Sequence, residues 1–368
     1  MKKLLLFGAL AFGLNAFGQV PSYVPTNGLL AWFPFNGNAL DESFNGNNGT
    51  LVGGVALTND RNNSINSAHN FDGQQLTYID CGNDASFDLQ NGASLTISAW
   101  VKPDGTGTFY GNEGVVSKAS STVNNIYGTY SISLLDGVPR FVVSNENGIP
   151  TWYSSAISSD TLQLNTWNHI VGVADFSNLE LRIYVNGDLK NITPWGGTLH
   201  SGQQNLLIGC RFKNNFGNQY MYNFGGDIDD VALWNVVLNQ CEIIDLYTSG
   251  MLGAGSQNGT TLTADQTGAT YQWLDCDNNY AVINGETNQS YTPAVTGNYA
   301  VEVNMNGCID TSACFLVDYT GIEELFQTEK ELIKIIDFMG RETEIKPNTP
   351  LIFIYSDGTR ERVMKIEE

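Results

Sequence analysis

The sequence predicts an all-β protein whose largest part is an antiparallel sandwich of two sheets. Residues 95–101 (LTISAWV) and 179–185 (LELRIYV) alternate apolar and polar side chains, and a period of two marks a strand with one buried face. Asn186-Gly187 follows the second segment directly and supplies the positive φ angles of a tight hairpin turn. Many short strands joined by such turns are typical of a two-sheet sandwich.

Residues 1–18 are expected to form a secretory signal peptide. A short basic start is followed by the apolar residues 4–12 and then by small residues, as in peptides that are removed on export. We expect cleavage between Gly18 and Gln19. No later segment reaches the roughly 20 apolar residues of a membrane helix, so no transmembrane segment is expected.

The charge of the chain argues against nucleic acid as a partner. The formal net charge is −21, and no Lys or Arg lies between Lys213 and Lys330. Nucleic-acid binding needs basic patches that neutralise phosphates. Hydrophobic residues make up 42% of the chain, which is enough for ordinary buried cores.

Changes in composition divide the rest of the chain into three units. A run of small residues at 247–259 (YTSGMLGAGSQNG) separates the first unit, 25–250, from the second, 254–318. After Val317 a Thr/Asn/Gly-rich composition gives way to a Glu/Lys-rich one. The third unit covers 322–368.

The remaining elements of the first unit are short strands, with one exception. Asp136-Gly137 predicts a hairpin turn between strands at 130–135 and 140–143. Only 239–247 (NQCEIIDLY) has a helical pattern, because its apolar residues fall on one face of a helix.

Eight segments of the first unit occur in an order known from one family. They are LAWFPFNGN (30–38), DES (41–43) with GNNGT (46–50), FDG (71–73), SLTISAW (94–100), TWNHIV (166–171), YVNG (184–187), LIG (207–209) and FGGDIDDV (224–231). The unit resembles a laminin-G-like jelly roll of the concanavalin A-like lectin/glucanase superfamily. The resemblance implies two curved antiparallel sheets, often with a structural calcium, and a role in binding glycans or proteins. A minority of the superfamily are glycoside hydrolases.

The loop 41–50 (DESFNGNNGT) is the candidate metal site. Asp41, Ser43 and Asn45 place side-chain oxygens at alternate positions, which is half of the oxygen cage that a hard cation such as calcium needs. The resemblance implies that the first and last strands lie side by side, which makes Asp229 the expected further ligand of a structural calcium. The alternative is an ordinary turn in which Asp41 caps its own backbone.

Aromatic residues in polar surroundings are the candidate ligand-binding residues. They are Trp152, Tyr153, Trp195, Tyr220 and Tyr222. Exposed rings of this kind can stack on the faces of sugars, so carbohydrate is the expected partner. The alternative is that these rings pack down on their own sheet.

No pattern in the sequence predicts an enzyme. The glucanase branch needs two or three carboxylates alternating on one strand, and the only dense acidic stretch, 227–230, contains no Glu. GxSxG and HExxH motifs are absent, and the three histidines lack metal-ligand spacing. We therefore expect a binding protein; a glycan-cleaving enzyme and an adhesin for protein partners are the alternatives.

The second unit has the pattern of a small β domain. Trp273 lies in one strand pattern, Gly297-Asn298-Tyr299 opens another, and a last strand lies near Phe315. The unit resembles a bacterial immunoglobulin-like domain, which implies a core tryptophan at 273 and a corner tyrosine at 299. Its expected role is that of a spacer.

The six cysteines of an exported chain favour disulfides. Cys276, Cys308 and Cys314 lie in the second unit, and the other three lie in the first. Because each unit holds an odd number, either one cysteine of each stays free or one bond crosses between the units. We expect Cys276 to pair with Cys308 or Cys314.

The third unit contains two apolar runs and a terminal hairpin pattern. IKIIDFMGRE (333–342), KPNTPL (346–351) and IYSDGT (354–359) with VMKIE (363–367) resemble, in order and spacing, the C-terminal sorting domain of the type IX secretion system of Bacteroidetes bacteria. This resemblance implies export by that machinery and removal of the sorting domain. We therefore expect a secreted or surface-attached protein that binds carbohydrate.

Overall fold

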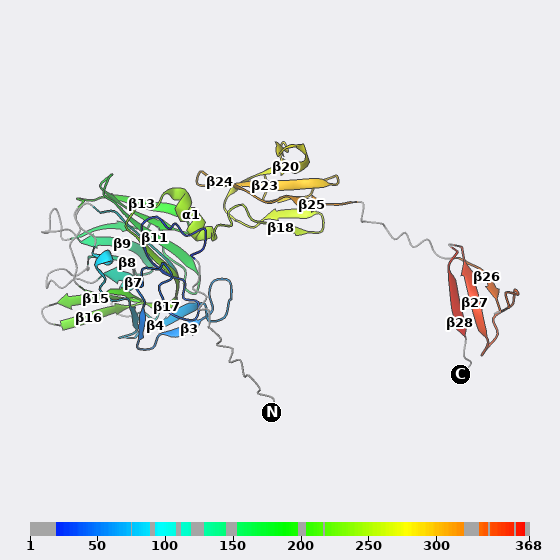
Figure 1. Cartoon of the computed structure of the whole chain (residues 1–368), viewed down its shortest axis with the longest axis horizontal. Coiled ribbons are helices and arrows are strands. Elements are labelled where there is room, and N and C mark those ends of the chain that lie inside the picture. Colours follow the sequence, from blue (N-terminus) through cyan, green and yellow to red (C-terminus); the bar gives the residue numbers. More distant parts are fainter. Residues whose placement is uncertain are drawn as a thin grey trace, which may run out of the picture.

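The structure is a computed structural model. It describes residues 20–74, 76–88, 93–107, 112–118, 129–144, 153–197, 204–215, 218–319, 331–337, 339–356 and 358–364. The expected signal peptide, with Gly18 and Gln19, lies outside the described residues. Strands dominate the described chain (Figure 1), so the prediction of an all-β protein is confirmed.

The first sheet of the N-terminal sandwich has eight antiparallel strands. They are β1 (Leu29–Phe33), β3 (Ala56–Thr58), β4 (Ala68–Asp72), β6 (Leu95–Pro103), β11 (Asn168–Asp175), β12 (Glu180–Val185), β13 (Asp188–Pro194) and β17 (Gly225–Trp234). Their order is β13-β12-β11-β6-β17-β4-β3, and β1 also pairs with β17. The first and last strands of the sandwich therefore lie side by side.

The second sheet has seven antiparallel strands. They are β2 (Thr50–Val52), β5 (Tyr78–Asp80), β7 (Asn112–Lys118), β8 (Tyr130–Leu135), β9 (Val138–Ser144), β10 (Tyr153–Ile157) and β14 (Leu206–Ile208). Their order is β10-β9-β8-β7-β14-β5-β2. A separate hairpin, β15 (Cys210–Asn215) with β16 (Asn218–Asn223), follows β14, and a 3-10 turn, η1 (Ala85–Phe87), follows β5.

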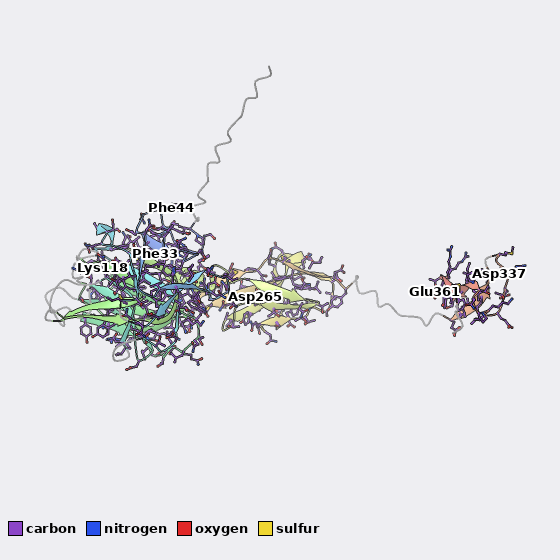
Figure 2. All side chains as sticks on the ribbon, turned by 90° about the horizontal axis from the view of Figure 1, so that it is seen from below. Phe33, Phe44, Lys118, Asp265, Asp337 and Glu361 are labelled. Atoms are coloured by element: carbon purple, nitrogen blue, oxygen red, sulfur yellow. A yellow bond between two sulfur atoms is a disulfide. The ribbon has the colours of Figure 1, made fainter. Side chains whose placement is uncertain are left out.

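One core fills the space between the two sheets. Phe33 and Ile97 from the first sheet meet Ile132 and Phe141 from the second, and all four are fully buried. Figure 2 labels Phe33 within the sandwich and Phe44 on a loop outside it. Burying each such side chain stabilises the fold by about 1.5–3 kcal/mol, which explains why the alternating pattern determines the sandwich.

Helix α1 (Gln240–Thr248) covers the outer face of the first sheet. Its first turn is closed by a capping box between Asn239 and Glu242, which satisfies backbone N–H groups that have no partner within the helix. Leu246 of the helix packs with Trp32 and Trp234 of the sheet. The predicted helix at 239–247 is thus present.

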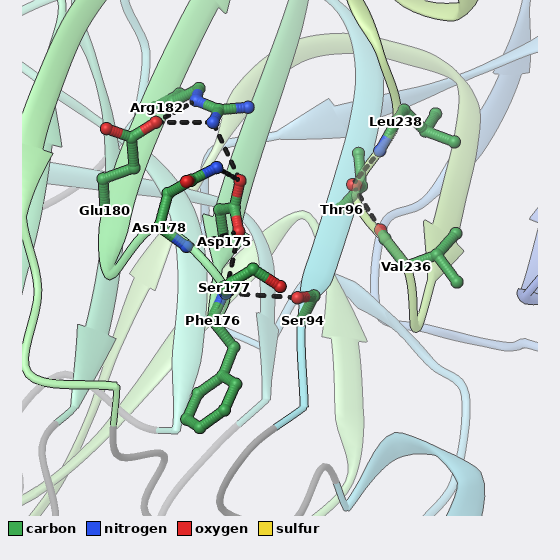
Figure 3. Close-up of polar contacts among 10 residues, drawn as sticks. All are labelled: Ser94, Thr96, Asp175, Phe176, Ser177, Asn178, Glu180, Arg182, Val236 and Leu238. Atoms are coloured by element: carbon green, nitrogen blue, oxygen red, sulfur yellow. Dashed lines mark hydrogen bonds and ion pairs between the residues drawn. The ribbon is translucent and has the colours of Figure 1, made fainter.

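Thr96 of β6 fixes the segment that leads into this helix. Its Oγ1 atom donates to the carbonyl of Val236 at 2.8 Å and accepts from the backbone N–H of Leu238 at 3.2 Å (Figure 3).

The second unit consists of two small sheets around one core. Trp273 is fully buried, and its Nε1 atom donates to the carbonyl of Asn288 at 2.9 Å. The elements are β18 (Gly255–Asn258), β19 (Thr261–Ala264), β20 (Thr270–Asp275), η3 (Cys276–Asn278), β21 (Ala281–Val282), β22 (Ser290–Tyr291), β23 (Gly297–Met305), β24 (Cys308–Thr311) and β25 (Phe315–Val317).

Helix α1 belongs to the cores of both units. Its Leu246 packs on the first sheet, whereas its Ile244 packs with Trp273 of the second unit. A disulfide joins Cys241 of the helix to Cys308 of β24. The helix accordingly lies beside the second unit in Figure 1.

The remaining cysteines divide into one bond and two thiols. The structure pairs Cys276 with Cys314, one of the two partners expected from the sequence. Cys81 and Cys210 are buried and carry no disulfide. One bond therefore crosses between the units, which is one of the two arrangements that the odd cysteine numbers allow.

The third unit is a three-stranded antiparallel sheet. Its strands are β26 (Leu332–Ile336), β27 (Pro350–Tyr355) and β28 (Arg360–Met364), in that order. In the part of the chain that the structure describes, no helix has the length and apolar character needed to cross a lipid bilayer.

Candidate functional site on the second sheet

The face of the second sheet that points away from the core carries a line of hydroxyl groups. Ile132 of β8 belongs to the core, and successive side chains of a strand point to opposite faces, so Ser131 and Ser133 point outward. Thr129 directly precedes the strand. All three are fully buried, and within the part of the chain that the structure describes their hydroxyl groups have no hydrogen-bond partner. A buried hydroxyl without a partner costs about 1–3 kcal/mol, so a molecule that hydrogen-bonds to this line would remove an existing penalty.

Arg140 of β9 lies beside this line. It is paired with Ser133 of β8, so both side chains point to the same face. Arg140 is only 8% exposed, its Nε atom has no hydrogen-bond partner, and no ion pair joins it to a carboxylate of the described residues. A buried charge without a counter-ion is strongly unfavourable.

The hairpin β15–β16 lies against the same face. Gly114 of β7 is paired with Ser133, and a Cβ atom at Gly114 would lie 2.2 Å from the backbone nitrogen of Arg211 in β15. Ser117 of β7 donates its hydroxyl to the carbonyl of Cys210 at 2.8 Å. The absence of a side chain at Gly114 therefore lets β15 approach the sheet closely.

This contact places a second arginine at the site. Arg211 is 2% exposed, and its guanidinium carbon lies 4.8 Å from the ring centroid of Tyr222, its partner across the hairpin. Stacking on an aromatic face helps to orient a guanidinium group. We call Thr129, Ser131, Ser133, Arg140 and Arg211 the hydroxyl–arginine face.

Carboxylates are scarce on the described strands that carry the hydroxyl–arginine face. Strands β7, β8, β9 and β10 contain one acidic residue, Glu113. It is paired with Leu134, whose side chain is in the core, and it accepts a hydrogen bond from the backbone N–H of Gly225 at 3.2 Å. Burial raises the pKa of Glu113. The face can thus donate hydrogen bonds and bind negative charge, but these strands provide no pair of carboxylates for acid–base chemistry.

The sequence contains only an ambiguous signal of this face. Residues 129–133 alternate hydroxyl and apolar side chains, which reads equally well as an ordinary strand with one face in water. The informative feature is that the hydroxyl side is also buried. Burial of both faces depends on contacts with distant segments such as β15, and periodicity within one strand does not report such contacts.

Two of the predicted ligand-binding aromatic residues are buried. Trp195 is 4% exposed and belongs to the core of the sandwich, so the prediction that its ring is available for stacking on a sugar is wrong. The reason is that the segment after β13 turns back onto the core. Tyr222 is also buried, but it lies under Arg211 at the candidate site.

The other three predicted aromatic residues have different placements. Tyr153 of β10 is partly buried and is paired with Ser144, whose neighbour Val143 points into the core. Tyr153 therefore borders the hydroxyl–arginine face. Tyr220 lies on β16, and Trp152 lies outside the described residues.

The predicted metal loop is closed by backbone hydrogen bonds. One carboxylate oxygen of Asp41 accepts from the N–H groups of Trp32 (3.0 Å) and Ser43 (2.9 Å). The other accepts from the N–H of Asn47 at 2.9 Å, and the Nδ2 atom of Asn45 donates to the carbonyl of Leu29 at 2.9 Å. These donors direct positive partial charge toward the position that a cation bound to Asp41 would occupy.

Asp229, the expected second ligand, has another partner. It forms an ion pair with Arg61 at 3.1 Å, and Arg61 also pairs with Asp230 at 2.6 Å. Burial, together with Asp230, raises the pKa of Asp229, whereas Arg61 opposes this rise. The described residues contain no group of three His, Cys, Asp or Glu side chains that could hold a metal ion. The residues as placed do not fit the calcium site predicted between Asp41 and Asp229.

The likeness of the first unit to known proteins agrees with this architecture. Residues 72–244 match the laminin-G type 3 family model of the concanavalin A-like lectin/glucanases superfamily. No curated protein matches the chain.

Several solved structures resemble the chain at low sequence identity. Domain 4 of AbnA, an extracellular arabinanase from Geobacillus stearothermophilus solved with arabinotriose, is 20% identical over 60% of this chain and 98% of that one, with a TM-score of 0.43. The binding domain of Paraclostridial Mosquitocidal Protein 1 is 16% identical over 90% and 76%, with a TM-score of 0.49. The CBM40 domain of a Ruminococcus gnavus sialidase, bound to sialyllactose, is 15% identical over 46% and 92%, with a TM-score of 0.38.

Proposed function

From the concanavalin A-like jelly roll of its first unit, we propose that this protein binds carbohydrate on the hydroxyl–arginine face. The observation that carries the proposal is the line of buried hydroxyl groups at Thr129, Ser131 and Ser133, which have no partner among the described residues. A sugar presents hydroxyl groups that both donate and accept, so it can satisfy each of these side chains. Buried polar groups are normally satisfied, and a cluster of exceptions on one face therefore points to a ligand.

Binding fits this site better than cleavage. Glycoside hydrolysis generally requires two carboxyl groups that flank the scissile bond. The only carboxylate of β7–β10, Glu113, faces the core side and is held by Gly225. We therefore propose a binding module that recognises its ligand without modifying it.

The proposal also includes export of the protein from the cell. The resemblance of 322–368 to a sorting domain supports secretion by the type IX route, with the second unit as a spacer between the binding domain and the cell surface. Deleting 322–368 should leave the protein in the periplasm, and normal release of the truncated protein into the medium would contradict this route.

A glycan array probed with the full-length protein tests the binding proposal. We expect selective binding, and we expect a Ser131→Ala/Ser133→Ala double variant to lose it while its melting temperature stays equal or rises, because two unsatisfied buried hydroxyl groups are removed. Ser256→Ala, at an exposed position of β18, is the matched control and should bind normally. Binding that survives the double variant would show that the ligand lies elsewhere.

A further inference from the structure

We propose that the second unit binds a lysine-bearing segment of a partner protein, in a groove on the outer face of its larger sheet. The inference is independent of the carbohydrate-binding function proposed above, because it concerns a different unit of the chain. It rests on an open groove, on a carboxylate inside the groove, and on the absence of basic residues from the sequence of this unit.

The groove has a volume of about 470 Å³, which is within the range of ligand-binding pockets. Tyr280 is 49% exposed and Val282 is 56% exposed, so a ligand can reach both side chains from solvent. The residues that line the groove are Leu274, Tyr280, Val282, Glu302, Thr311 and Ser312.

The groove lies on the face of the sheet that points away from the core of the unit. Trp273 of β20 and Val301 of β23 belong to that core. Successive side chains of a strand point to opposite faces, so Leu274 and Glu302 point outward. The groove therefore combines an apolar floor with a carboxylate.

The strand register sets the distance between these two parts of the groove. Glu302 is paired with Gln272, which lies two residues before Leu274 on β20. Leu274 and Glu302 are thus diagonal neighbours, about 7–8 Å apart. A lysine side chain is long enough to lie along Leu274 and place its ammonium group at Glu302.

Glu302 has no counter-ion within its own unit. Its carboxylate forms no hydrogen bond or ion pair in the ranges that the structure describes. Residues 254–318 contain Asp and Glu but no Lys, Arg or His, so every formal charge of the unit has the same sign. A surface of one charge attracts the opposite charge, and a carboxylate in a groove interacts more strongly with a cation than one in open water.

Tyr280 provides an aromatic face at the edge of the groove. Its hydroxyl group lies 3.3 Å from the Sγ atom of Cys314, which the disulfide to Cys276 fixes in place. Its φ angle is 58°, in a region that bulky residues seldom adopt. Such conformations persist where the surrounding structure holds them, and they cluster at sites that hold ligands. An ammonium group over this ring gains a cation–π interaction.

Lysine fits this combination better than the other ligand classes. Its aliphatic stem packs on apolar surface while its ammonium group stays at the polar end, and lysines are mostly exposed on protein surfaces. A neutral sugar would leave Glu302 without a counter-ion. An acidic ligand would be repelled by the whole unit.

Fluorescence anisotropy with the full-length protein and a labelled peptide of alternating lysine and serine tests the inference at physiological salt. We expect saturable binding. A peptide with norleucine in place of lysine keeps the apolar stem without the charge and should bind more weakly by about tenfold or more. Glu302→Gln should weaken binding of the lysine peptide by a similar factor. The melting temperature of this variant should not change, because Glu302 has no partner to lose.

Asp265→Asn is the matched control. Asp265 is exposed in the same unit (Figure 2) and does not line the groove, and its substitution removes the same charge. Binding of the lysine peptide should be nearly unchanged. Equal losses in Glu302→Gln and Asp265→Asn would show general attraction to an acidic surface and would overturn the inference. Absence of saturable binding would also overturn it, as would a neutral glycan whose binding is lost in Glu302→Gln, because the groove would then be a sugar site.

Discussion

At the scale of single residues, Asp41 shows how a loop can resemble a metal site and be held by other means. Its carboxylate accepts three backbone N–H groups, from Trp32, Ser43 and Asn47. In Asp41→Ala these donors lose their acceptor, so we expect a loss of about 2 kcal/mol or more in the free energy of unfolding. Denaturant titration measures the loss, and Asp41→Asn, which keeps one oxygen, should lose less.

Asp41 also determines whether calcium affects the thermal stability of the protein. Because the N–H donors occupy the carboxylate, the melting temperature of the native protein should be the same with calcium and with a chelator. A fall of several degrees in chelator, absent from Asp41→Ala, would restore the calcium site predicted from the sequence.

His169 is expected to make stability depend on pH. Its Nε2 atom lies 2.7 Å from the hydroxyl of Ser98 in a buried site, and burial, with a smaller contribution from Arg61, lowers its pKa to about 3. Below the ordinary histidine pKa of about 6.5, the unfolded chain binds a proton that the folded chain excludes. The contribution of His169 is therefore fully present above about pH 6.5 and is lost as the pH falls toward about 3.

The slope of the free energy of unfolding against pH measures this effect. Between about pH 6 and about pH 4 each such histidine contributes about 1.4 kcal/mol per pH unit. His169→Gln should reduce the slope by about this amount, and a variant with the slope of the native protein would show that the ring is protonated in the fold. His69, whose pKa is lowered by burial to about 4, provides an independent second variant.

At this scale, the role of a residue can be predicted from the sequence when its neighbours along the chain determine it. It cannot be predicted when a contact with a distant segment determines it. The alternation of oxygens at Asp41, Ser43 and Asn45 was visible, but the three N–H groups that occupy Asp41 belong to the fold. Trp195 lies among polar neighbours and is nevertheless buried in the core. The burial of Arg140 could not be predicted, because only the structure shows that its charge is buried and has no counter-ion among the described residues.

At the scale of elements, the close approach of β15 to β7 depends on Gly114. A Cβ atom there would meet the backbone nitrogen of Arg211 at 2.2 Å, so Gly114→Ala must displace the hairpin. Overpacking of this kind costs about 1–3 kcal/mol, and moving Arg211 should also weaken glycan binding. Melting curves and the array measure the two effects.

Ser117→Ala serves as a milder control for this prediction. It removes only the hydrogen bond to the carbonyl of Cys210, so the hairpin keeps its position and binding should persist. Unchanged stability and binding in Gly114→Ala would show that the hairpin moves freely relative to the sheet.

The elements themselves were largely predictable. Alternation at 95–101 and 179–185 corresponds to β6 and β12, and the turn at Asn186-Gly187 joins β12 to β13. Such patterns are local, because a strand with one buried face carries its own signature. Placing β15 across the outer face of β7 was not predictable, since nothing within either segment specifies which distant strand it will contact.

At the scale of the whole molecule, the disulfide between Cys241 and Cys308 should make the first two units unfold together. It closes a loop with a sequence separation of 67 residues, and a loop of this length stabilises by about 4 kcal/mol in the chain-entropy model. Calorimetry of the native protein should show one transition for both units. Cys241→Ser/Cys308→Ser should separate it into two.

Removal of the other bond is the control. Cys276 and Cys314 both lie in the second unit, so Cys276→Ser/Cys314→Ser should lower the stability of that unit and leave the crosslink intact. Two transitions already present in the native protein would contradict the coupling.

The sequence suggested a crossing bond only as one of two possibilities. The odd number of cysteines in each unit shows only that not all of them can pair within their own unit. It does not show which cysteines form the disulfides. The pairing depends on helix α1, whose Leu246 faces the first sheet while its Ile244 enters the second core. A helical pattern with apolar residues on one face does not reveal that two domains share the helix.

The crosslink also determines how the protein carries a mechanical load. If the first sandwich is held by a ligand and the chain is pulled from beyond the second unit, tension reaches Cys308 and passes through the sulfur atoms directly into Cys241. Residues 242–307 lie inside the closed loop, so the short path from Cys308 to Cys241 bypasses strands β18 to β23. The bond between Cys276 and Cys314 leaves this path in place. A pull therefore cannot draw out the segment between the two units, and the distance between the first sandwich and the pulled end of the second unit stays short.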